Sequence, residues 1–386
     1  MNKKLFLLPF LGALSAFGPF VLDLYLPALP LIQKYFSTST SYAQLTLSTT
    51  MAGLAFGQLI AGPLSDKFGR KIPLLISLML YTISTIIIFF TPSIEIFIAM
   101  RAIEGLASAG SIVIARAIVG DLYEGEEMRR FFSLLVVINS LAPIFSPIIG
   151  SFILTFASWR GEFTVLSVIG VLLFIASFKF HESLPKGRRL KGGVLQSYGV
   201  YLKLICMRDF LVFVAISAGA LDAIFTYISA SAFILEDTYG FSQSQFAFAF
   251  AANGAGFGIA ASLASRLSAR QAMIFGAFLL IFAGVFLAIS LIFKFDAIFL
   301  MTLFFAVLFS AGFILPTTSF YAISLAKSYA GSASALLGFA GFSMGGIVSA
   351  SIGRVEIFNG AAVSFLLCSA LCFFGVGFAY FRGLLR

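Results

Sequence analysis

Four ionisable residues stand out within the long apolar stretches of this chain: Asp23, Arg101, Glu104 and Asp222. A charge inside a membrane is costly, so such residues are functional candidates by default. A carboxyl group in a low-dielectric cavity can cycle between a proton and a cationic or polar solute. These residue types therefore predict a site that couples proton binding to the movement of a solute.

The two aspartates occupy comparable places in the two halves of the chain. Asp222 lies near the middle of the apolar run 210–235, and Asp23 lies in the outer half of the run 5–30, within L-D-L-Y-L-P. We expect both to face a central cavity. The alternatives are a capping or interfacial hydrogen bond for Asp23 and a structural hydrogen bond between helices for Asp222.

Arg101 and Glu104 are three residues apart, so they share one face of a helix and could form an ion pair. Breaking such a buried pair would strand a charge. A structural ion pair and a proton relay are both open interpretations. Arg116 and Asp121, near the end of the same stretch, are assigned to loop geometry.

Residues 62–71 read G-P-L-S-D-K-F-G-R-K and place four charges at the end of an apolar run. A switchable ion pair at Asp66 would bias one conformational state over another. The sequence therefore predicts a cytoplasmic gate, which consists of Gly62, Asp66, Lys67, Gly69, Arg70 and Lys71.

Pro143 and Pro147 are followed closely by Gly150 and Ser151 in the run 131–155. Proline removes a backbone hydrogen bond and bends a helix, and Gly150 permits a close approach of another element. This pattern predicts a bent helix. Its role is either in transport or in packing alone.

Twelve apolar runs must position these residues. Hydrophobic residues form 60% of the 386-residue chain and charged residues 11%, whereas a soluble domain has about 25% charged residues. Each run is long enough to cross a bilayer, which takes about 20 residues. We expect helices at 5–30, 43–65, 72–91, 94–119, 131–155, 163–182, 210–235, 244–266, 271–293, 297–325, 332–353 and 360–381.

The polar, basic stretch 183–209 divides these runs into six and six. We expect a six-helix bundle at 1–182, a cytoplasmic linker at 183–209 and a second bundle at 210–386. With an offset of 201, five identities relate the second run to the eighth: Ser41, Gln44, Gly53, Phe56 and Gly57 match Ser242, Gln245, Gly254, Phe257 and Gly258. Internal repeats of this kind place a substrate site between two halves near mid-membrane.

The basic residues predict the orientation. With the N-terminus in the cytoplasm, 19 of the 25 Lys and Arg residues lie on the cytoplasmic side; Arg101 and Arg116 lie within a helix, and the outer side has only Lys34, Arg160, Lys294 and Arg354. This bias predicts that both termini are cytoplasmic. The net charge of +9 is therefore assigned to the membrane surface and to topology. No nucleic-acid partner is expected.

Enzyme-like patterns have simpler explanations. Gly341-Phe342-Ser343-Met344-Gly345 fits a nucleophile elbow but lies in a small-residue apolar segment, and the only histidine, His181, is remote from it. It is interpreted as a G-x-x-x-G helix-packing face. No phosphate-binding loop for ATP is present, and Cys206, Cys368 and Cys372 have no metal-site spacing. We expect no enzymatic activity, cofactor or metal.

Eight segments resemble the Bcr/CflA group of major facilitator drug:proton antiporters along essentially the whole chain. They are L-D-L-Y-L-P-A-L-P (22–30), G-P-L-S-D-K-F-G-R-K (62–71), R-A-I-E-G (101–105), A-R-A-I-V-G-D (115–121), A-P-I-F-S-P-I-I-G (142–150), W-R-G-E-F (159–163), S-A-S-A-F-I-L (229–235) and A-G-S-A-S-A-L-L-G (330–338). The resemblance implies an all-α membrane protein of 12 helices in two pseudo-symmetric bundles. It also implies Asp66 as part of an inner gate, Arg101 as the proton-coupling arginine, and 131–155 as the bent antiporter helix.

The sequence departs from the usual pattern of that group in three respects. Glu104 stands where the group has Gln, and Ser146 and Ser151 interrupt the usual G-P-x-x-G-G. The group also has an apolar residue near the position of Asp222 and Pro where Ala232 stands. The resemblance implies proton-coupled export of small amphipathic compounds by a monomer in the bacterial inner membrane. The substrate-side departures keep a dedicated exporter of one metabolite, such as a siderophore, as an alternative. A proton-coupled uptake symporter is a further one.

Overall fold

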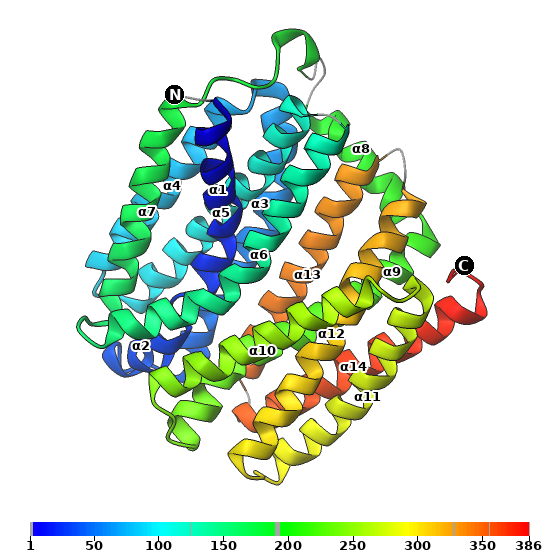
Figure 1. The fold of residues 1–386 in the computed structure, drawn as a ribbon. Coiled ribbons are helices and arrows are strands. Elements are labelled where there is room, and N and C mark those ends of the chain that lie inside the picture. Colours follow the sequence, from blue (N-terminus) through cyan, green and yellow to red (C-terminus); the bar gives the residue numbers. More distant parts are fainter. Residues whose placement is uncertain (1–2, 124, 190–193, 327–328, 355, 386) are drawn as a thin grey trace. The chain divides into compact units, whose positions relative to one another are not determined.

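The computed structural model describes residues 3–123, 125–189, 194–326, 329–354 and 356–385. Within these ranges every regular element is a helix, as Figure 1 shows. Tertiary contacts divide the chain into two compact units. Unit 1 comprises Met1–Ser37 and Thr49–Ser197, and unit 2 comprises Thr38–Ser48 and Tyr198–Arg386. The division expected from the sequence, into bundles at 1–182 and 210–386 with a linker at 183–209, remains a prediction.

Unit 1 holds the helices drawn from blue to green in Figure 1. They are α1 (Lys3–Asp23), η1 (Leu26–Ala28), α2 (Leu29–Tyr35), most of α3 (Thr40–Phe68), α4 (Lys71–Phe90), α5 (Ile94–Leu122), α6 (Gly125–Leu154), α7 (Trp159–Lys179) and η2 (Lys186–Arg188). The helix α8 (Val194–Ile205) contains the boundary between the units.

Unit 2 holds the helices drawn from green to red. They are α9 (Arg208–Ala232) with its π-helical continuation η3 (Phe233–Thr238), α10 (Gln243–Ala264), α11 (Ala269–Ile292), α12 (Ala297–Leu325), α13 (Ala330–Ile352) and α14 (Ile357–Phe381). The first turns of α3 also belong to this unit.

The same helix pairings occur inside each unit. In unit 1, α1 packs against α5 and α6, and α4 packs against α5 and α7; in unit 2, α9 packs against α12 and α13, and α11 packs against α12 and α14. Each of these four pairs in unit 1 therefore has a counterpart in unit 2, six positions later in the series of long helices. This recurrence supports the internal repeat inferred from the sequence offset.

Eleven described helices are long and apolar enough to cross a membrane, and Ala142–Leu154 within α6 is a shorter apolar segment. Their bounds lie within about three residues of most of the expected runs, and the run expected at 297–325 coincides with α12. The first run differs, because α1 ends at Asp23 and the chain continues through η1 and α2. Pro27 and Pro30 lie in the first turns of these two short helices, where the missing N–H is tolerated.

The stretch 183–209, expected as a polar linker, contains the helix α8. None of the twelve helices expected from the sequence lies in this stretch. The glycines and the proline at 185–193 obscure the start of this helix in the sequence. The run Val194–Ile205 is short, and polar residues separate its apolar ones. Twelve residues are too few to span a bilayer, so this helix does not alter the number of crossings.

Candidate functional site

In unit 1, Arg101 and Glu104 form a fully buried ion pair one turn apart on α5. Arg101 Nη1 donates to Glu104 Oε2 at 2.6 Å, and both side chains have no solvent exposure. The second carboxylate oxygen, Oε1, accepts from Thr85 Oγ1 of α4 at 3.1 Å. A hydrogen-bonded counter-ion compensates part of the cost of burying each charge. Glu104 is therefore held as a carboxylate by a base on its own helix.

Arg101 also connects α5 to the end of α1. Its Nη2 donates to the carbonyl oxygen of Val21 at 3.0 Å. Its guanidinium carbon lies 4.1 Å from the centre of the Tyr25 ring, within the range of a cation–π interaction. The arginine thus holds the region where α1 stops, two residues on either side of Asp23.

Asp23 is the last residue of α1 and is 3% exposed. No described group forms a hydrogen bond with its Oδ1 atom. Buried polar atoms are nearly always hydrogen-bonded, so an exception calls for an explanation such as a bound proton, water or ligand. The described contacts of Oδ1 therefore give no support to the capping alternative for Asp23.

In unit 2, Asp222 lies on α9 among hydroxyl groups. Its Oδ1 accepts from Thr226 Oγ1 at 3.2 Å and from Ser364 Oγ of α14 at 3.1 Å, and these two hydroxyls are 2.6 Å apart. Asp222 is 5% exposed. A hydroxyl can donate to a carboxylate or accept from a carboxylic acid. Both protonation states of Asp222 are therefore compatible with this hydrogen-bonding group.

The structure brings Arg101 and Glu104 together, and Arg101 contacts Val21 and Tyr25, which lie two residues on either side of Asp23. Asp222 belongs to the other unit. The expectation that Asp23 and Asp222 face one cavity between the halves remains a prediction.

Arg70 is the centre of a second cluster in unit 1, between α3 and α4. Its Nε donates to Asp121 Oδ2 at 2.8 Å, and its Nη1 donates to Asp66 Oδ1 at 2.5 Å and to Ser65 Oγ at 2.7 Å. Burial alone lowers the pKa of Arg70, but the hydrogen bonds that it donates to Asp121 and Asp66 raise the pKa above its ordinary value. The guanidinium therefore stays charged between two carboxylates.

Glu182 anchors the turn that carries Arg70. Its carboxylate accepts from the backbone N–H groups of Arg70 at 2.8 Å and Lys71 at 3.3 Å, at the start of α4. An acid at a helix N-terminus satisfies otherwise unpaired N–H groups and complements the helix dipole. Gly69 precedes this turn with φ +91°, and a Cβ there would lie 2.3 Å from Glu182 Oε2. This position therefore requires glycine.

The expected gate residues are not equivalent. Asp66 and Arg70 are paired, whereas Lys67 Nζ lies over the Phe68 ring at 5.6 Å. A Cβ at Gly62 would meet only Val113, at 3.9 Å, so packing does not require glycine there. Asp121, which the sequence analysis assigned to loop geometry, lies in the last turn of α5 and pairs with Arg70 in the connection between α3 and α4.

The helix α6 contains Pro143 and Pro147. A Cβ at Gly150 would lie 1.9 Å from the Leu24 carbonyl oxygen and 3.0 Å from Glu162 Oε1. The close approach predicted for Gly150 is thus made to the segment after α1. Glu162, in the first turn of α7, is fully buried beside it. Sequence reasoning did not single out this acid, although W-R-G-E-F contains it.

The G-x-x-x-G pattern lies on α13, which packs against α9. A Cβ at Gly341 would meet Leu221 at 2.1 Å, and one at Gly345 would meet Phe225 at 2.3 Å. The interpretation as a helix-packing face is therefore confirmed. Cys368 and Cys372 are buried free thiols, and Cys206 is exposed.

Comparison with known proteins gives one consistent family. The sequence model of the Major Facilitator Superfamily matches residues 10–350. The uncharacterized MFS-type transporter YdgK of Bacillus subtilis is 34% identical over 92% of this chain and 90% of its own length. The bicyclomycin resistance protein homolog of Haemophilus influenzae is 29% identical over 63% of this chain and 61% of its own length.

The solved structure of a D-xylose-proton symporter has the same fold, with a TM-score of 0.74, 16% identity and 98% coverage of both chains. The all-α major facilitator fold expected from the sequence is thereby confirmed. The resemblance to Bcr/CflA-type proteins agrees with the bicyclomycin resistance relative. With the family's model matching most of its length and a relative at 34% identity along nine-tenths of both chains, this chain belongs to the major facilitator superfamily of membrane transporters.

Proposed function

We propose that this transporter exports small amphipathic compounds from the bacterial cytoplasm in exchange for protons, by alternating access. The protein would act as a monomer in the inner membrane with both termini in the cytoplasm. The proposal rests on the hydrogen-bond partners of Asp222, which are neutral hydroxyls. The bicyclomycin resistance relative supports export, and the symporter neighbour shares only the fold.

Asp222 and Glu104 differ in the partners that they have. Glu104 is paired with Arg101 at 2.6 Å, so its negative charge is compensated in place. The described hydrogen bonds of Asp222 come from two neutral hydroxyls, Thr226 and Ser364. No described base pairs with Asp222, and a proton or a cationic substrate can therefore supply the missing charge. This difference favours Asp222 as the site of exchange.

Arg101, Glu104 and Asp23 would form the corresponding part of unit 1. Arg101 holds the end of α1 through Val21 and Tyr25. In this role the pair of Arg101 and Glu104 holds the end of α1, and the proton is exchanged at Asp222.

The proton gradient is sufficient for export. One charge crossing 100 mV releases about 2.3 kcal/mol, and roughly 1.4 kcal/mol corresponds to a tenfold concentration ratio. At ~150 mV, one proton per neutral solute would support a gradient on the order of 300-fold.

The test begins with a comparison of deletion and overexpressing cells for drug tolerance and for release of metabolites, which distinguishes a drug exporter from a dedicated metabolite exporter. Uptake of the compound so identified is then measured in inverted vesicles with an acidic interior. We expect accumulation driven by outward proton flow. An uptake symporter would not accumulate the compound under this gradient.

Asp222→Asn identifies the proton site in the same vesicles. We expect it to abolish proton-driven accumulation while downhill exchange of substrate continues, because the substrate path survives. Asp209→Asn is the matched control, since Asp209 lies on the same helix but its side chain is 45% exposed. If proton-driven accumulation persists in Asp222→Asn and is lost in Glu104→Gln, the coupling site lies on α5 instead.

A further inference from the structure

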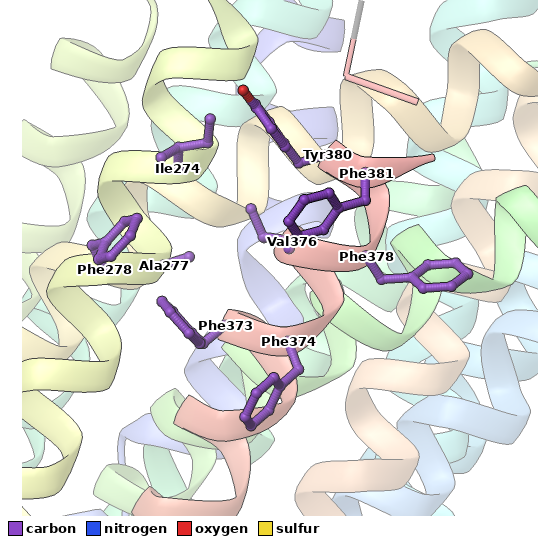
Figure 2. A pocket seen from close by; sticks show the side chains of 10 residues that line it. Ile274, Ala277, Phe278, Phe373, Phe374, Val376, Phe378, Tyr380 and Phe381 are labelled. Carbon is purple, nitrogen blue, oxygen red and sulfur yellow. The ribbon is translucent and has the colours of Figure 1, made fainter. Parts of the chain in front are cut away.

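An apolar groove lies between α11 and α14 in unit 2. Its volume is about 640 Å³. Figure 2 shows its lining, which comes from both helices: Ile274, Ala277, Phe278, Phe373, Phe374, Val376, Gly377, Phe378, Tyr380 and Phe381. Phe278 and Phe373 meet across the two helices with ring centres 5.2 Å apart. The proposed transport site at Asp222 does not include any of these residues.

The groove opens onto the outer surface of the helix bundle. Phe374 is 71% exposed and Phe381 is 88% exposed. In a membrane protein, such large exposed rings contact lipid rather than water. The only polar side-chain atom in the lining is the hydroxyl of Tyr380, in the last turn of α14. The groove is therefore apolar along its length and polar at one end.

Two arginines lie at that polar end. The guanidinium of Arg270, in the first turn of α11, stacks 4.7 Å from the centre of the Tyr380 ring. Arg382, directly after α14, lies 5.9 Å from the Phe378 ring. No described carboxylate pairs with Arg270, and Arg382 is only 4.0 Å from Asp209 at the edge of ion-pair range. The mouth of the groove thus carries the positive charge of Arg270, which no described carboxylate compensates, and that of Arg382, which Asp209 compensates only in part.

We propose that this groove binds one anionic phospholipid, with an acyl chain along the aromatic lining and the phosphate at Arg270 and Arg382. Basic pockets between membrane helices bind anionic headgroups, and the planar guanidinium suits bidentate contact with phosphate. The stacking of Arg270 on Tyr380 holds its N–H donors at the mouth of the groove.

The distribution of polarity selects this occupant over others. A pocket for a small polar substrate has several polar groups that orient the ligand, whereas the described lining has one, at its end. A phospholipid matches both the apolar length and the cationic end.

The test measures lipid retention by native mass spectrometry of the full-length protein in detergent. Phosphatidylglycerol and phosphatidylcholine with identical acyl chains are the probes, added separately and in competition. Arg270→Gln removes the cation. Gly377→Leu fills the groove, and a Cβ at Gly377 has open space around it, so this variant should fold. Arg354→Gln is the control, because it removes an exposed positive charge beyond the opposite end of the unit 2 helices.

We expect the wild type to retain one phosphatidylglycerol at least tenfold more tightly than phosphatidylcholine. Arg270→Gln should reduce this preference to about twofold, Gly377→Leu should weaken retention of both lipids, and Arg354→Gln should match the wild type. Equal retention of the two lipids by the wild type would overturn the proposal. So would a dimer mass that disappears in Gly377→Leu, or an Arg270→Gln variant that behaves like Arg354→Gln.

Discussion

At the scale of single residues, the kind of partner decides what a buried acid can do. Glu104 is saturated by Arg101 and Thr85, whereas Asp222 is surrounded by hydroxyls that suit both protonation states. The sequence singled out Asp23, Arg101, Glu104 and Asp222, and it predicted the contact between Arg101 and Glu104 from their spacing. It could not predict Ser364 as a partner of Asp222, because 142 residues separate them.

Replacing Glu104 should reveal how much the buried pair stabilises unit 1. Glu104→Leu strands the charge of Arg101, so we expect it to destabilise the fold by about 3–5 kcal/mol. Glu104→Gln keeps an acceptor for Arg101 and Thr85 and should cost much less. Thermal unfolding of the purified variants in detergent measures the difference. A wild-type unfolding temperature in Glu104→Leu would show that the charge of Glu104 does not stabilise the fold.

Substitutions of the two acids that bind Arg70 should differ in their effects on transport and on stability. The side chain of Asp66 is 54% exposed and that of Asp121 is 12% exposed. We expect Asp66→Asn to slow transport with little change in folding or substrate affinity, because Asp121 still holds Arg70. Asp121→Asn should also lower the unfolding temperature. Turnover in vesicles and thermal unfolding measure the two effects, and wild-type turnover in Asp66→Asn would remove Asp66 from the mechanism.

At the scale of elements, the apolar runs predicted nearly all the long helices, because a helix that crosses a bilayer needs about 20 mostly apolar residues. The runs did not predict the interruption after Asp23, because residues 24–30 continue the apolar run without a polar break. Two prolines in L-P-A-L-P carry that signal. The sequence also could not predict the contacts of the turn before α4, because Glu182 lies 112 residues from Arg70.

Two glycines of the predicted gate provide a matched pair of variants. Gly69 has φ +91°, so alanine there costs about 1–2 kcal/mol in backbone energy and would also collide with Glu182. Gly62 is within α3, and its added Cβ would make only ordinary contact. We expect Gly69→Ala to lower both the unfolding temperature and turnover, and Gly62→Ala to leave both near wild type. A strong loss of turnover in Gly62→Ala would indicate a role for this position that the resting contacts do not show.

Gly150 should be as intolerant of a side chain for a different reason. A Cβ there would overlap the Leu24 carbonyl at 1.9 Å, whereas one at Gly258 on α10 would meet nothing within 4 Å. We expect Gly150→Ala to push α6 away from the segment after α1 and to reduce both stability and transport. Gly258→Ala is the control and should be neutral. Thermal unfolding and vesicle transport of the two variants test whether this close contact is needed.

At the scale of the whole molecule, the orientation across the membrane follows from charge. The excess of Lys and Arg on one set of loops predicts cytoplasmic termini. Helices and internal contacts do not define a cytoplasmic side, so this prediction depends on the sequence alone. The native cysteines offer a direct test, because Cys206 is exposed at the end of the linker and Cys368 and Cys372 are buried.

Cys206 should therefore react with a membrane-impermeant maleimide in inside-out vesicles and remain unlabelled in right-side-out vesicles. The thiolate is the reactive form and must be accessible to water, which excludes the two buried thiols from the signal. Cys206→Ser should abolish labelling and serves as the background for Arg354→Cys, which should label only in right-side-out vesicles. Labelling of Cys206 in right-side-out vesicles would reverse the topology, and it would then place the Arg70 cluster on the outer side, where it could not act as a cytoplasmic gate.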